Sequence, residues 1–261
     1  MVRIEPPVRL LPSRSPVRGP VLPDAPRGAG RDLVEQLIDI GRRNAGGRWT
    51  AGDDLAGARA MHSTNRGVEL RAALEGDYDW LEVDVRRIRG ALVASHDPTP
   101  APDALRMTDW IRIGAATQRG LKLDFKERDA IAPTLDLVAA AGVPDARVVI
   151  NVPVEGRERV TLEQLRRIRR RFPRATINLS LGSGAYTAHQ ARRAVELARS
   201  VGGPIAFPLD LARVDERVVR AFKRGGAVAI WNDPRRTPVR DTGATRAQLR
   251  RWGVNGTIDL R

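Results

Sequence analysis

The sequence predicts an α/β protein with the fold of a (β/α)8 TIM barrel. Short apolar segments alternate with amphipathic ones eight times between residues 57 and 261, a rhythm typical of a barrel at the small end of its size range. A length of 261 residues suits one barrel as well as two average domains, and 42% hydrophobic content is enough for a sizeable core. A doubly wound open sheet is the alternative, but neither GxGxxG nor GxxxxGKS/T occurs in the chain.

The chain begins with a segment that we expect to lie outside the barrel. Residues 1–30 are too rich in Pro, Arg and Gly to bury a strand or a helix, so we predict a disordered or surface-hugging tail. Residues 31–261 then form a single barrel domain. Its first element is a short helix from Asp32 to Asn44, which could cap the bottom of the barrel. The apolar face of this helix consists of Leu33, Val34, Leu37 and Ile38.

The predicted strands and helices follow one another in strict alternation. Strands are expected at Ala58 to Met61, Trp80 to Val85 with a hairpin arm from Ala91 to Ser95, Leu121 to Lys126, Arg147 to Val152, Thr176 to Leu181, Pro204 to Leu209, Ala227 to Trp231 and Gly253 to Leu260. Helices are expected at Val68 to Leu74, Thr108 to Thr117, Ile131 to Ala141, Leu162 to Arg171, Ala188 to Val201, Glu216 to Arg224 and Arg246 to Trp252. Thr108 is the expected N-cap of its helix.

Composition limits the possible functions. The net charge is +14, but 42 of the 45 basic residues are Arg and are spread over the whole chain, and aromatic residues make up only 4%. A nucleic-acid-binding protein is therefore the least favoured alternative, because few aromatic side chains are present on which nucleic-acid bases could stack. The charge instead favours steering of an anionic substrate or loose contact with an anionic membrane surface. Without cysteine, disulfides and thiolate metal sites are excluded. We expect a soluble, cytoplasmic protein, since no secretory signal or apolar span is evident.

Ionisable residues fall where the first three barrel strands end. Active sites of this fold form at the carboxyl ends of the strands, so polar residues there indicate function. Glu82 and Asp84 stand two apart on the second strand and project to the same side, as do Asp124 and Lys126 on the third. Six ionisable residues are expected to converge on one rim: His62, Glu82, Asp84, His96, Asp124 and Lys126.

This set of side chains suits phosphodiester cleavage. Three carboxylates without cysteine favour a hard divalent cation such as Mg²⁺ or Ca²⁺. His62 and His96 are suited to general acid and base roles near neutral pH, and Lys126 could contact a phosphate oxygen. Taken singly, each of these residues is more often a structural ion pair or a satisfied histidine. Their joint placement favours the functional interpretation.

The motifs also resemble a known group of barrel enzymes. The runs His62-Ser63-Thr64-Asn65, Leu81-Glu82-Val83-Asp84-Val85, Ser95-His96-Asp97-Pro98 and Gly120-Leu121-Lys122-Leu123-Asp124-Phe125-Lys126 are similar to those of the glycerophosphodiester phosphodiesterase-like superfamily. Within it, the chain most resembles the menorin family over about residues 58–261. The same arrangement is similar to that of the sphingomyelinase D-like toxins, which are metal-dependent barrels.

The resemblance implies a role for each matching residue. It implies that His62 and His96 are the acid/base pair, and that Glu82, Asp84 and Asp124 are Mg²⁺ ligands. By the same resemblance Lys126 and Asn65 are substrate-binding residues and Trp231 is a wall of the substrate cleft.

Other features depart from the glycerophosphodiesterases proper. Ser63 stands where those enzymes have Arg, and their next metal-binding Glu segment does not follow. Lys122 has no assigned role, although this chain otherwise prefers Arg. Asp259 could either support the rim or pair with an Arg.

We therefore expect a Mg²⁺-dependent phosphodiesterase acting on a small-molecule or lipid-headgroup phosphodiester, such as a glycerophosphodiester or a lysophospholipid. Attack by water makes it a hydrolase, whereas attack by a hydroxyl of the substrate makes it a lyase with a cyclic phosphate product. A non-catalytic ligand-binding barrel of menorin type is the main alternative. The sequence leaves open the exact substrate, the role of the tail and the oligomeric state.

Overall fold

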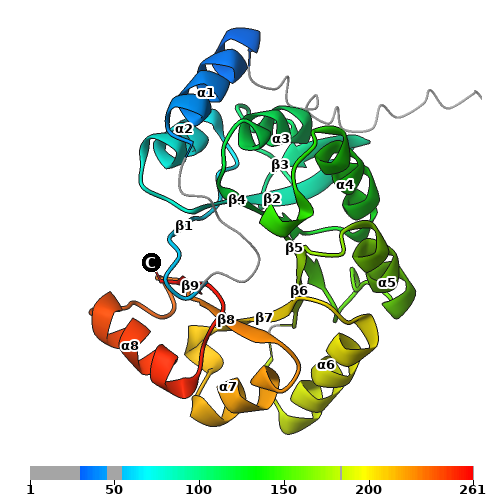
Figure 1. Ribbon diagram of the computed structural model, residues 1–261, viewed down its shortest axis with the longest axis vertical. Coiled ribbons are helices and arrows are strands. Elements are labelled where there is room, and N and C mark those ends of the chain that lie inside the picture. Colours follow the sequence, from blue (N-terminus) through cyan, green and yellow to red (C-terminus); the bar gives the residue numbers. More distant parts are fainter. Residues whose placement is uncertain (1–29, 46–54, 183, 261) are drawn as a thin grey trace, which may run out of the picture.

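The computed structural model describes residues 30–45, 55–182 and 184–260, and they form a nearly closed barrel of eight parallel strands with helices between them (Figure 1). The strand order is β1-β2-β4-β5-β6-β7-β8-β9, and β3 pairs antiparallel with β2 as an arm. The strands are β1 (Ala60–Met61), β2 (Trp80–Ile88), β3 (Ala91–Ala94), β4 (Gly120–Phe125), β5 (Val148–Pro153), β6 (Thr176–Ser180), β7 (Ile205–Asp210), β8 (Ala227–Trp231) and β9 (Ile258–Asp259). The predicted fold class is confirmed.

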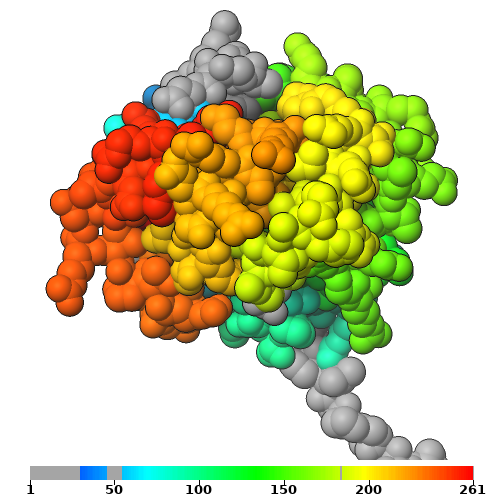
Figure 2. All heavy atoms as spheres, turned by 90° about the horizontal axis from the view of Figure 1, so that it is seen from below, coloured from blue at the N-terminus to red at the C-terminus, as the bar shows by residue number. Residues whose placement is uncertain are grey.

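The helices surround the strands in Figure 1. They are α1 (Arg31–Arg43), α2 (Gly67–Glu75), α3 (Met107–Ala115), α4 (Ile131–Ala140), α5 (Leu162–Arg171), α6 (Ala188–Val201), α7 (Glu216–Lys223) and α8 (Thr242–Trp252). Short 3-10 turns occupy Arg128–Ala130, Asp145–Arg147 and Leu211–Arg213. Helix α1 packs against α2 and α3 on the outside of the barrel, and α6, α7 and α8 follow one another on the face shown in Figure 2.

Local boundaries differ from the sequence prediction at several elements, such as α8, which begins four residues before the predicted Arg246, and α3 and β9. Thr108 was expected to cap its helix, but α3 begins one residue earlier, after Arg106, and no side chain caps it. Arg106 forms an isolated bridge with Val93 in the arm, so the chain enters the helix directly from that pairing. Strand β9 is much shorter than predicted, because its ladder with β8 covers only Ile258 and Asp259. The predicted tail, apart from Gly30, lies outside the described residues.

Alternation along β2 separates the apolar core from the interior of the barrel. Leu81, Val83 and Val85 are fully buried in the main hydrophobic cluster, which includes the inner faces of the surrounding helices. Trp80 instead packs inside the barrel in a small cluster of its own. Because successive side chains point to opposite faces, Glu82 and Asp84 lie on the same side as Trp80, inside the barrel.

The register of the parallel strands brings polar residues to one level. Asp84 pairs with Asp124, Asp124 with Asn151, and Asn151 with Asn178. One step lower, towards the amino ends of the strands, Glu82 pairs with Lys122. The barrel interior is thus polar near the carboxyl ends of β2, β4, β5 and β6, where sites of this fold are built. Among the described helices, none has the length and apolar character that crossing a bilayer requires.

Candidate active site

A cavity of about 600 Å³ opens at the carboxyl ends of the strands. Of the predicted site residues, His62, Asp84, His96, Asp124, Lys126 and Trp231 line it. Glu82 lies deeper and lines a smaller internal cavity of about 20 Å³. Asn65 lies beside Asp84, to which it is hydrogen bonded. The loops and strands therefore bring the predicted residues to one place, with His96 at the exposed edge.

The three predicted metal ligands form one cluster. Carboxylate oxygens of Glu82, Asp84 and Asp124 lie within 4.8 Å of one another. Glu82 and Asp84 are 0% and 1% exposed, so neither is solvated from bulk water. Buried carboxylates held this closely require compensation by cations or hydrogen-bond donors.

Lys126 supplies part of that compensation. Its Nζ lies 2.7 Å from Asp84 Oδ1 and 2.8 Å from Asp124 Oδ2, so one ammonium bridges two of the three carboxylates. From the sequence we expected Lys126 to contact a substrate phosphate. Its ion pairs with Asp84 and Asp124 were not predicted from the spacing of these residues. Asp124 also accepts a hydrogen bond of 2.5 Å from Asn151 Nδ2.

The loop after β1 holds the β2 carboxylates in place. Asn65 Nδ2 donates to Asp84 Oδ2 at 2.8 Å, and Asn65 Oδ1 accepts from the Asp84 amide at 3.0 Å. The amide of Ser63 donates to Glu82 Oε2 at 2.6 Å, and its φ of 55° is rare for a residue with a side chain. A strained backbone that aims an N–H group at a buried carboxylate indicates a site feature. Asn65 therefore orients Asp84 in this structure.

Each candidate histidine faces an aspartate through Nδ1. His62 Nδ1 lies 2.8 Å from Asp259 Oδ2 and 3.6 Å from Glu82 Oε2, and the His62 side chain is 18% exposed. His96 Nδ1 lies 2.9 Å from Asp97 Oδ1, and its side chain is 68% exposed. Asp259 is the site residue that sequence reasoning left undecided. Its place beside the carboxyl end of the last strand was the available signal.

Burial and neighbouring charges perturb the site carboxylates in opposite directions. Burial raises the pKa of Glu82, and the charges of Asp84 and Asp124 add to the rise although His62 and Lys122 oppose it. For Asp124, burial also opposes ionisation, but Lys126, Lys122 and the hydrogen bonds of Lys126 and Asn151 prevail and lower its pKa. Burial alone would lower the pKa of Lys126, yet Asp124 and Asp84 raise it well above its ordinary value.

The donor set fits a divalent cation. Glu82 Oε1 is buried without a hydrogen-bond partner among the described residues, which is costly for a carboxylate oxygen. The ligand atoms on offer are carboxylate oxygens, which Mg²⁺ and Ca²⁺ prefer. An acidic cluster that could bind a divalent metal is thus present at the predicted residues.

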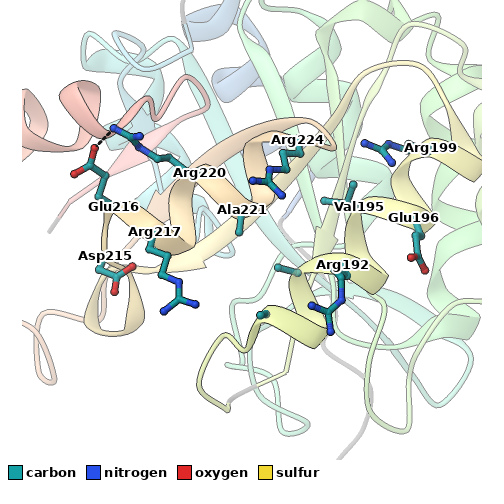
Figure 3. Close-up of a pocket in the computed structure, with 12 residues that line it drawn as sticks. Arg192, Val195, Glu196, Arg199, Asp215, Glu216, Arg217, Arg220, Ala221 and Arg224 are labelled. Atoms are coloured by element: carbon teal, nitrogen blue, oxygen red, sulfur yellow. Dashed lines mark hydrogen bonds and ion pairs between the residues drawn. The ribbon is translucent and has the colours of Figure 1, made fainter.

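A larger cavity of about 960 Å³ lies outside the barrel, between α6 and α7 (Figure 3). Arginines of both helices line it, and Figure 3 shows them flanking Val195 and Ala221. Two of its three acidic side chains have other partners, since Asp215 caps α7 and Glu216 pairs with Arg220. None of its lining residues is a histidine. We therefore assign the candidate site to the cavity at the strand ends.

Comparison with known proteins places the chain in a family. Residues 54–221, more than half of the chain, match the model of the Menorin N-terminal domain. The chain belongs to the menorin family. Of the motifs that suggested this resemblance, those of β1, β2 and β4 all lie within the matched part.

Solved structures share the fold of this menorin-family barrel at low identity. A proposed glycerophosphoryl diester phosphodiesterase from Agrobacterium tumefaciens is 12% identical with a TM-score of 0.52, covering 77% of this chain and 92% of its own. A proposed phosphonomutase from Burkholderia cenocepacia is 14% identical with a TM-score of 0.52, covering 87% and 92%. The aldolase QR15 is 11% identical with a TM-score of 0.50, covering 80% and 91%. These likenesses support the barrel architecture.

Proposed function

We propose that this chain is a metal-dependent phosphodiesterase-like enzyme that cleaves a phosphodiester of the glycerophosphodiester or lysophospholipid type. The observation that carries the proposal is the combination of one carboxylate cluster with two histidines at a single cavity. Both histidines face aspartates through Nδ1, an arrangement suited to proton transfer at Nε2. The barrel likeness to a proposed glycerophosphoryl diester phosphodiesterase supports the same class of reaction.

The two histidines differ in a way that suggests separate roles. His62 is mostly buried, and Asp259 facing Nδ1 favours the tautomer that leaves Nε2 as a proton acceptor. We assign it as the general base that takes the proton of the attacking hydroxyl. His96 is exposed at the cavity edge and is assigned as the general acid that protonates the leaving oxygen. One P–O bond forms and one breaks, so each histidine changes its protonation once.

The carboxylates and their neighbours prepare the place of the phosphoryl group. Glu82, Asp84 and Asp124 would hold a divalent cation, which supplies electrostatic stabilisation of the phosphoryl oxygens when bound. Asn65 and Lys126 fix the orientation of Asp84, and Trp231 forms part of the cavity wall. The attacking oxygen can come from water or from a hydroxyl of the substrate, which gives a cyclic phosphate. The positive chain charge also favours loose contact with an anionic membrane that carries such a substrate.

Phosphorus NMR with a panel of glycerol and lysolipid phosphodiesters tests this function. We expect new signals from the monoester or cyclic product with Mg²⁺ present, and none after chelation. His62→Ala and Asp124→Ala should each abolish turnover. Val68→Ala, at an exposed residue of α2, is a control that should retain it.

Three results would count against the proposal. Turnover that survives both chelation and the two substitutions would place the chemistry elsewhere. Absence of turnover with the whole panel, together with saturable binding of the same compounds, would favour the non-catalytic ligand-binding barrel. Steep salt-dependent affinity for DNA or RNA would favour the nucleic-acid alternative.

A further inference from the structure

The chain contains three lysines, and the structure accounts for the side chains of two. Lys126 bridges Asp84 and Asp124, and Lys223 donates to the carbonyl of Gly253 at 2.7 Å. The ammonium of Lys122 makes no hydrogen bond and no close ion pair with any residue that the structure describes. Its electrostatic partners, Glu82 and Asp124, act on it from a greater distance.

Lys122 occupies an unusual position for an unpaired cation. It lies inside the barrel on β4, in register with Glu82, one alternation step below Asp124. It lines the floor of the 600 Å³ site cavity and also the small internal cavity beneath it. The half-buried ammonium therefore faces the space in which a substrate would lie.

Three arginines withdrawn from solvent show how backbone carbonyls compensate a cation in this chain, although the Nε atoms of Arg119 and Arg169 have no hydrogen-bond partner among the described residues. Arg119 donates to four backbone carbonyls, Arg147 to two, and Arg169 to four. Lys122 has none of these partners. Its Nζ is not among the buried side-chain atoms that lack a partner in the described part of the chain, so the ammonium is open to the cavity, where its three N–H donors can reach a ligand.

The chemistry of the ammonium indicates the sign of that ligand. A lysine side chain offers three N–H donors and no acceptor. An oxyanion, such as the non-bridging oxygen of a phosphodiester, is the ligand that forms the strongest hydrogen bond with it.

We propose that Lys122 forms an oxyanion subsite on the cavity floor, where its ammonium donates to a non-bridging oxygen of a bound phosphoryl group. Lys126 is held by two carboxylates, so Lys122 is the lysine of the cavity whose N–H donors are all free for a ligand. The phosphoryl identity of the ligand rests on the proposed function. The existence of an anion subsite rests on the position of Lys122 alone.

Selective observation of the three lysines tests the subsite. Reductive methylation with ¹³C-formaldehyde labels Lys122, Lys126, Lys223 and the amino terminus, and single Lys→Arg variants assign the signals. Inorganic phosphate added to the Mg²⁺-treated full-length protein should shift the Lys122 signal saturably and leave the Lys223 signal unchanged. A Lys122 signal that does not respond to phosphate or to a phosphodiester would overturn the subsite.

Affinity measurements on unmethylated protein give an independent test. Lys122→Met should weaken phosphate binding about 10- to 100-fold, the value of one charge-assisted hydrogen bond. Lys223→Met is the matched control and should bind like the parent. Equal binding by Lys122→Met and the parent, with both folded, would show that Lys122 is only a counterion for Glu82.

The two proposals fail separately. A protein that binds phosphate through Lys122 but turns over no phosphodiester retains the subsite and loses the proposed reaction. A protein that cleaves phosphodiesters at an unchanged KM in Lys122→Met retains the reaction and loses the subsite.

Discussion

At the scale of single residues, the site depends on contacts between the first and last strands of the barrel. Asp259 belongs to β9, and His62 follows β1, yet their side chains lie 2.8 Å apart. Under the proposed function, this proximity would make Asp259 a positioning residue for His62, in the way that a buried carboxylate fixes the tautomer of a general base.

Replacement of Asp259 tests this role. Asp259→Asn preserves the size of the side chain but removes the charge that faces Nδ1, so kcat should fall on the order of 100-fold or more, while KM changes little. Steady-state kinetics and thermal unfolding, compared with the exposed control Asp39→Asn, separate this effect from misfolding. If kcat is unchanged and neither limb of its pH profile is shifted or flattened, His62 does not need Asp259.

Sequence reasoning recovers residues whose neighbours share a strand more readily than those that meet across the barrel. Glu82 and Asp84 on β2, and Asp124 and Lys126 at the end of β4, follow from two-residue alternation, and their convergence follows from the fold. The pairing of His62 with Asp259 links opposite ends of the domain, so no local pattern reports it. Likewise, spacing places Lys126 at the rim but does not show that two carboxylates hold it.

At the scale of elements, the order of strands and helices is predictable from the sequence. The spacing of apolar residues that marks each element lies within a short stretch of the chain. Helix α6 (Ala188–Val201) and strand β8 (Ala227–Trp231) have the predicted bounds. The start of α3 is not predictable in this way. By local preference Thr108 is a better N-cap than Arg106, but the helix begins after Arg106, which is bridged to Val93. Tertiary pairing overrides cap preference there.

The end of α2 shows how a helix terminus is satisfied without a local cap. The last carbonyls of a helix have no partner within it, and those of Ala73 and Leu74, with that of Gly76, accept hydrogen bonds from the buried Arg119. The same guanidinium also bonds the carbonyl of Asn44 after α1. Arg119 therefore ties α1 and α2 to the start of β4.

Loss of this guanidinium should destabilise the barrel strongly. Arg119→Met leaves several buried carbonyls without donors, so the free energy of unfolding should fall by about 3 kcal/mol or more. Urea unfolding measures the change. Arg112→Met, which removes an exposed pair with Glu35, is the control and should cost less than about 1 kcal/mol. Equal effects of the two substitutions would show that the carbonyls of α2 find other donors.

At the scale of the whole molecule, the strand order begins at β1 and ends at β9, and among the described residues these two strands share no backbone ladder. The contact of His62 with Asp259 joins them at the carboxyl end, beside the carboxylate cluster. Candidate site side chains thus also connect the two end strands of the barrel. A ligand that orders the cluster should stabilise the entire fold.

Metal binding offers the measurement of that coupling. A cation that binds the folded cluster but not the unfolded chain stabilises the fold by about 2.7 kcal/mol at a concentration 100 times its Kd. For a domain of this size, that corresponds to a rise in Tm of roughly 5–10 °C. Mg²⁺ or Ca²⁺ should produce the rise in the parent protein and in Glu75→Gln, which alters an exposed carboxylate, but not in Asp124→Asn. A rise that persists in Asp124→Asn would locate the ion away from the cluster, and no rise at millimolar concentrations would remove the metal from the proposed site.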